Sequence, residues 1–138
     1  MVLRTRKSNG AGIVEAVVGL FVVIPLVLAL VDVGSCVVCQ TSNDAMAKQA
    51  ARAAAAANII ANPGSDQTAA QNIISNWPGT SAIAGAPTLV TFRGSAGAGQ
   101  VYVRTQMTCV LPIPIPMAMT SINFQAEDTE PYTAILPN

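Results

Sequence analysis

The fold of this chain is decided by the stretch Lys7-Ser8-Asn9-Gly10-Ala11-Gly12-Ile13-Val14-Glu15 and by the apolar block that follows it. Residues 16–31 contain no charged or polar side chain, and after Asp32 the apolar run resumes over residues 33–38. A helix needs about 20 mostly apolar residues to cross the hydrocarbon core of a bilayer. The sequence therefore predicts one transmembrane helix over about residues 16–38.

Charge predicts the orientation of this helix. Arg4, Arg6 and Lys7 are three of the seven basic residues of the chain, and they all precede the apolar block. Basic residues close to a membrane span tend to stay in the cytoplasm. We therefore expect a single-pass protein of the inner (cytoplasmic) membrane, with its N-terminus in the cytoplasm and its C-terminal part outside.

The helix is expected to continue beyond the membrane surface. Residues 41–61 contain no Pro or Gly, and nine of the thirteen residues 45–57 are Ala, the best helix former. The sequence Asn62-Pro63-Gly64 is the first clear stop signal. A helix that ends at Ala61 would be roughly 75 Å long at 1.5 Å per residue, so only its first half can lie in lipid.

The remaining residues predict a small domain that contains a second helix and strands. Ser65 is a candidate N-cap for a helix to about Asn76. Side chains then alternate with a period of two over residues 89–93, 101–109 and 121–127, which is typical of strands. The glycine-rich residues 94–99 predict a hairpin between the first two strands, and a fourth strand could follow over residues 132–136.

These observations predict an α+β fold. Its parts are a long N-terminal transmembrane helix, a short second helix and a small antiparallel β-sheet. The expected organisation is a basic leader peptide at residues 1–10, the long helix at 11–61 and an extracytoplasmic α+β domain at 62–138. The alternating prolines Pro112, Pro114 and Pro116 favour a stiff extended loop between strands.

Glu15 is the first candidate functional residue. A carboxylate at the entrance of an apolar span costs free energy and persists mainly where it finds a partner. Cleavage after Gly10 would create such a partner, because the new α-amine on Ala11 would lie one helical turn from Glu15. Pairing of these charges between neighbouring subunits would set their axial register.

A short basic leader, a Gly, a Glu five residues later and a hydrophobic helix together resemble the type IV prepilin family. The further pattern of Pro25, Asp32-Val33-Gly34 and the Ala-rich run with Lys48 and Arg52 resembles TadE-like (TadE/TadF) proteins of the tight adherence (Flp) pilus. The resemblance covers roughly residues 6–57.

The resemblance implies a minor pilin or pseudopilin, a structural subunit and not an enzyme. Its partners would be the prepilin peptidase that cuts between Gly10 and Ala11, other pilin subunits with their assembly machinery, and the lipid bilayer. The processed subunit could enter a surface pilus. The composition shows no basic patch with interleaved aromatics, so we expect no nucleic-acid partner.

Three cysteines allow at most one intrachain disulfide, from Cys36 or Cys39 to Cys109. Cys36 and Cys39 share a helix face, which suits packing better than redox chemistry. The chain has no His, and three thiolates leave a structural zinc site one ligand short. We expect no metal and no cofactor.

Two other interpretations stay open. Val33-Gly34-Ser35-Cys36 resembles a lipobox, which would make the protein a lipoprotein acylated at Cys36. Alternatively, the helix is an uncleaved anchor for a membrane-tethered binding domain. Asp32 could pair with a partner protein or reach water at the outer membrane face.

Overall fold

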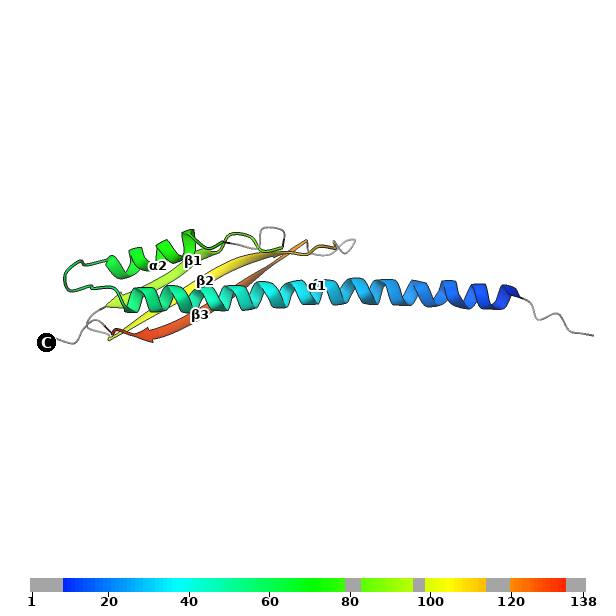
Figure 1. The fold of residues 1–138 in the computed structure, drawn as a ribbon, viewed down its shortest axis with the longest axis horizontal. Coiled ribbons are helices and arrows are strands. Elements are labelled where there is room, and N and C mark those ends of the chain that lie inside the picture. The colour runs from blue at the N-terminus through cyan, green and yellow to red at the C-terminus, as the bar shows by residue number, and fades with distance from the viewer. Residues whose placement is uncertain (1–8, 79–82, 96–98, 114–119, 134–138) are drawn as a thin grey trace, which may run out of the picture.

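A computed structural model of the chain describes residues 9–78, 83–95, 99–113 and 120–133. The elements are α1 (Asn9–Ala55), α2 (Ser65–Ser75), β1 (Thr88–Ser95), β2 (Gln100–Val110) and β3 (Ser121–Pro131). The strands form one antiparallel sheet in the order β1-β2-β3. Figure 1 shows the first half of α1 projecting away from this sheet and from α2. The predicted α+β class, with a long apolar helix, a short helix and a small antiparallel sheet, is confirmed.

Helix α1 has 47 residues and is therefore roughly 70 Å long. It changes character at Asp32. All described side chains before Asp32 are exposed, whereas Asp32, Ser35, Cys39 and Asn43 are buried at helical spacing. The first half of α1 is thus bare in the monomer, and the second half packs against α2 and the sheet. We call this packed part of the protein, from Asp32 onward, the head.

Helix α1 ends at Ala55, before the predicted end at Ala61. The Ala57 N–H donates to the carbonyl of Ala54 at 3.1 Å, which tightens the last turn. Thr133 then donates to the Ala55 carbonyl from both its N–H (3.2 Å) and its hydroxyl (3.4 Å). Helix propensity could not predict this end, because the group that binds the Ala55 carbonyl is Thr133, which is distant in the sequence.

Helix α2 lies alongside the C-terminal half of α1 (Figure 1). The prediction that Ser65 caps it was wrong. The cap is Gly64, which has a φ of 85°, and the Ser65 hydroxyl has no hydrogen-bond partner in the described part of the chain. Glycine tolerates this left-handed conformation, so the helix begins at Ser65, one residue earlier than a serine cap would place it.

The helix-facing side of the sheet supplies the other wall of the core. Residues of β2 alternate between buried and partly exposed, so that Val101, Val103 and Met107 point toward the helices. In β3, Ile122, Phe124 and Ala126 lie on this same side, which agrees with the period of two predicted over residues 121–127. The fully buried α1 and α2 alanines that complete the core are Ala50, Ala51, Ala54 and Ala70.

Strands β1 and β2 form the predicted antiparallel pair, and Gly94 lies opposite Val101. The alternation predicted for β1 was wrong at one point, because the register shifts between Leu89 and Thr91. This bulge lets both Leu89 and Phe92 pack against the core, whereas strict alternation would place them on opposite faces.

Three other predicted features fall partly outside the described residues. Residues 96–98 of the hairpin turn and residues 114–116 of the proline-rich loop are not described. Of the predicted fourth strand, Tyr132 and Thr133 are described and are not in a strand.

Candidate functional site

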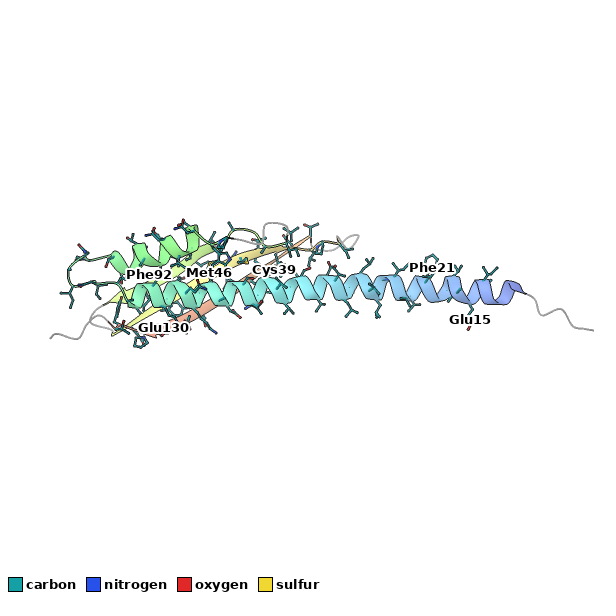
Figure 2. The ribbon with its side chains drawn as sticks, viewed as in Figure 1. Glu15, Phe21, Cys39, Met46, Phe92 and Glu130 are labelled. Atoms are coloured by element: carbon teal, nitrogen blue, oxygen red, sulfur yellow. A yellow bond between two sulfur atoms is a disulfide. The ribbon has the colours of Figure 1, made fainter. Side chains whose placement is uncertain are left out.

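The predicted processing residues lie at the start of α1. The helix begins at Asn9, so Gly10 and Ala11 belong to its first turn, and Glu15 follows Ala11 by four residues. Glu15 is exposed, and Figure 2 shows its side chain pointing away from the helix, far from the head. No ion pair involves Glu15 within the described ranges. The structure therefore places Ala11 and Glu15 one helical turn apart.

The surface of α1 after Glu15 is strongly apolar. Phe21 is 78% exposed, and the neighbouring valines, leucines and isoleucines are also open. Soluble monomeric proteins rarely expose a continuous apolar surface of this extent. By length and composition, α1 contains a segment able to cross a membrane.

Asp32 marks the boundary between the bare helix and the head. Its side chain is only 7% exposed, and its Oδ1 accepts a hydrogen bond from the Ile113 N–H at 3.3 Å. Ser35, one turn later, is also buried and donates its hydroxyl to the carbonyl of Val31 at 3.0 Å. The structure therefore places Asp32 against the head, where the sequence left a partner or water as alternatives.

A disulfide joins α1 to β2 just beyond this boundary. It links Cys39 to Cys109, whose Cα atoms are 5.9 Å apart, and leaves Cys36 as a partly buried free thiol. Cys39 belongs to the buried stripe of α1 that faces β2, whereas Cys36 lies on the adjoining helix face. Burial of the Cys39 face of α1 against β2 therefore decides between the two bridges that the sequence allowed.

A buried polar network, which the sequence analysis missed, lies one turn further along α1. The Thr105 hydroxyl donates to Asn43 Oδ1 at 2.9 Å, and Asn43 Nδ2 donates to the Phe124 carbonyl at 3.2 Å. Asn43 and Thr105 are both fully buried. The available signal was the spacing of Asn43 from Cys39 and Met46, which places an amide within an apolar helix stripe.

A second missed contact ties the end of the chain to α2. The Tyr132 hydroxyl donates to Asp66 Oδ2 at 2.6 Å, and the Gln67 N–H donates to Asp66 Oδ1 at 2.8 Å. Burial, together with the bond to Asp66, raises the pKa of Tyr132 above its usual value. A Cβ atom on Gly94 would collide with the Asp66 carboxylate and the Tyr132 hydroxyl, so this contact requires glycine.

The outer face of the sheet is polar. Glu127 Oε2 accepts hydrogen bonds from the Tyr102 hydroxyl at 2.5 Å and from Arg104 Nη2 at 2.8 Å. These two partners lower the pKa of Glu127, with the Tyr102 bond as the larger cause. Cross-strand pairs of this kind stabilise an exposed antiparallel face modestly. The described residues contain no group of three or more metal-ligating side chains.

The described geometry thus contains a bare apolar helix with one acid near its start, and a disulfide-linked head. No protein-family model matches the sequence, and comparisons with curated proteins and with solved structures also find no match.

Proposed function

We propose that this chain is a minor pilin or pseudopilin of a tight adherence pilus or a related secretion system. In this proposal a prepilin peptidase cuts after Gly10, and the first half of α1 holds the subunit in the inner membrane. The head then lies outside the cytoplasm. The protein acts as a structural subunit and not as an enzyme.

The observation that carries the proposal is the division of α1 into two unlike halves. The first half is apolar and exposed, and it has Glu15 five residues after Gly10. The second half forms the spine of a small α+β head. A single continuous helix that serves both as membrane segment and as core of the head suits a subunit that moves from the membrane into a filament.

The position of Glu15 supports a role in assembly. Cleavage after Gly10 would place a positive α-amine on Ala11, one helical turn from the Glu15 carboxylate. In an apolar environment the attraction between these charges is much stronger than in water. A subunit whose acid meets the amine of a neighbour would adopt a defined axial position.

The disulfide and the basic leader both support the orientation. Disulfides form and persist mainly outside the cytoplasm, which suits a head closed by the Cys39–Cys109 bridge. The cluster of Arg4, Arg6 and Lys7 favours a cytoplasmic N-terminus. The two features lie on opposite sides of the apolar segment.

Intact-mass and N-terminal analysis of the protein from its native membrane tests the proposal. We expect a chain that begins at Ala11, and we expect Gly10→Val to retain the leader. Gly19→Val is the matched control, since it makes the same change on the exposed helix, where a new Cβ has no neighbour within 4 Å. An intact leader in the wild type would instead identify an uncleaved anchor.

The same measurement tests the lipoprotein alternative. A chain that begins at an acylated Cys36 would contradict the pilin proposal. The packing disfavours this start, because it would remove Asp32 and Ser35, which are both buried against the head.

A further inference from the structure

A groove runs along α1 where the bare helix meets the head, and we call it the Asp32 groove. Its walls are almost entirely apolar and come from α1, from β3 and from the residue after β2. They are formed by Ala29, Asp32, Val33, Cys36, Val37, Gln40, Leu111, Ile122 and Phe124. The groove follows the helix for about three turns, from Ala29 to Gln40, so its length suits the side of another helix.

Asp32 is the one ionisable carboxylate in this apolar groove. Its only hydrogen bond within the described ranges is the 3.3 Å bond from the Ile113 N–H. The ion pairs of the described residues, Arg52–Glu130 and Arg104–Glu127, lie elsewhere in the head. A buried carboxylate is costly unless a positive charge pairs with it. Among the described residues, none that lines the groove supplies this positive charge.

Lipid does not fill the whole groove. Burial of α1 against the rest of the protein begins at Asp32, so this inference places residues 12–31 in the hydrocarbon core and not the 16–38 suggested by the sequence. These residues span about 30 Å, which is the thickness of that core. Val37, Ile122 and Phe124 then lie beyond the reach of acyl chains. A protein helix that continues out of the bilayer, as α1 itself does, can cover both parts of the groove.

A second copy of this chain at the same depth does not supply the cation. Residues 8–47 contain no Lys or Arg. Two copies related by an axis along the membrane normal would bring their Asp32 carboxylates toward each other, and like charges repel. Within the membrane, where copies lie at one depth, the cation must therefore come from a different polypeptide.

We propose that the Asp32 groove binds the apolar helix of a different membrane protein, and that a Lys or Arg of this helix pairs with Asp32. The inference rests on the membrane insertion of α1 under the proposed function, but not on cleavage after Gly10. It gives the assembly partner a defined chemistry, namely an apolar helix with one basic side chain near the outer membrane surface.

Cys36 provides a natural reporter, because its thiol is free and lines the groove one turn after Asp32. In native membranes we expect Cys36 to resist a membrane-impermeant maleimide, and we expect Asp32→Asn to speed its labelling several-fold. Asparagine can still accept the Ile113 hydrogen bond, so this variant removes the charge and keeps the internal contact. Asp44→Asn is the matched control and should leave Cys36 protected.

Two further measurements separate a partner from simple burial. A Cys36→Ser/Val38→Cys variant reports on an exposed α1 position just outside the groove, and it should label rapidly with or without Asp32→Asn. A photoreactive amino acid introduced in place of Val37, which lines the groove, should crosslink to a basic apolar helix of another protein, and Asp32→Asn should abolish this product. Equal Cys36 labelling in wild type and Asp32→Asn, or crosslinks only to lipid or to a second copy, would overturn the inference.

The N-terminal analysis of the same membrane sample keeps the two proposals separate. A chain that begins at Ala11 but whose labelling does not depend on Asp32 would refute the groove partner and leave the pilin proposal standing. An uncleaved chain with Asp32-dependent protection would do the reverse.

Discussion

Two acids on α1 occupy opposite environments, although one continuous helix carries both. Glu15 is exposed on a bare apolar surface, whereas Asp32 is buried where that surface meets the head. Once lipid surrounds the helix, the carboxylate of Glu15 and that of Asp32 each need a positively charged partner. For Glu15 the proposed partner is the Ala11 amine after processing, and for Asp32 it is a basic side chain of a neighbouring helix.

Replacing Glu15 by Gln tests its role in assembly. The variant should still insert into the membrane and fold, since Glu15 contacts no part of the head (Figure 2). Its incorporation into pili or into the assembly complex should fall strongly, measured as the ratio of sheared or complex-bound protein to total membrane protein. Asp44→Asn, which changes an acid of the head portion of α1, serves as the control. Unchanged incorporation of Glu15→Gln would contradict the role proposed for Glu15.

Asn43 supplies a fully buried polar contact between α1 and the sheet. Asn43→Ala would leave the buried Thr105 hydroxyl and the Phe124 carbonyl without their partner. Each unsatisfied buried group costs about 1–3 kcal/mol, so the free energy of unfolding should drop by a few kcal/mol. Urea unfolding of the detergent-solubilised protein measures this change.

Two companion variants show whether the loss comes from the network. Adding Thr105→Val to Asn43→Ala should recover part of the stability, because one orphaned hydroxyl is removed. Asn123→Ala removes an exposed side chain that accepts a bond from Thr108, and it should have little effect. An additive double variant would indicate that lost packing, and not hydrogen bonding, explains the effect of Asn43→Ala.

At the scale of elements, the second half of α1 is the piece against which the other parts of the head assemble. It contacts β2, β3 and α2, and alanines at its buried positions allow α2 to approach closely. Figure 2 shows Cys39 and Met46 on the part of the helix that lies against the sheet. The disulfide adds a covalent link between α1 and β2, elements far apart in the sequence.

Removing the disulfide should weaken the attachment of α1 to the sheet. The bridge closes a loop with a sequence separation of 70 residues, and native disulfides commonly contribute about 2–5 kcal/mol. Cys39→Ala/Cys109→Ala should therefore unfold at clearly lower urea concentration than the wild type. Cys36→Ser should match the wild type in stability. Thiol titration of the unreduced wild-type protein should find one free cysteine, and finding three would contradict the bridge.

At the scale of the whole molecule, the chain separates into a part with a core and a part without one. No described side chain before Asp32 is buried, so residues 12–31 contribute nothing to the packing of the head. The exposed outer face of the sheet is polar, whereas the exposed half of α1 is apolar. The two parts are therefore suited to different surroundings, water for the head and lipid for the helix.

A chain that starts at Asp32 tests this division. We expect it to be soluble without detergent and to keep both helical and strand signals in circular dichroism, because it retains every described buried residue. Its thermal midpoint should lie close to that of the full chain in detergent. A variant of the same fragment with Met46→Asp, which places a charge in the core, should fail to fold. An unfolded wild-type fragment would show that the bare helix stabilises the head.

Much of the architecture could be predicted from local sequence. The apolar residues 16–38, interrupted only at Asp32 and Ser35, indicate a membrane segment because a spanning helix needs about 20 residues, and the Ala-rich run indicates a helix because of propensity. The period-two pattern of residues 101–109 indicates a half-buried strand for an equally local reason. The adjacency of Gly10, Ala11 and Glu15 is also local, since a helix fixes residues four apart on one face.

Only the tertiary structure decided the contacts between distant segments. It paired Cys39 with Cys109, ended α1 at Ala55 through Thr133, and buried Asp32 beside Ile113. Each of these outcomes depends on which face of α1 meets the sheet and on how far along the helix the strands reach. Periodicity defines faces within one element, but burial against a second element selects among them, and that selection is a property of the assembled chain.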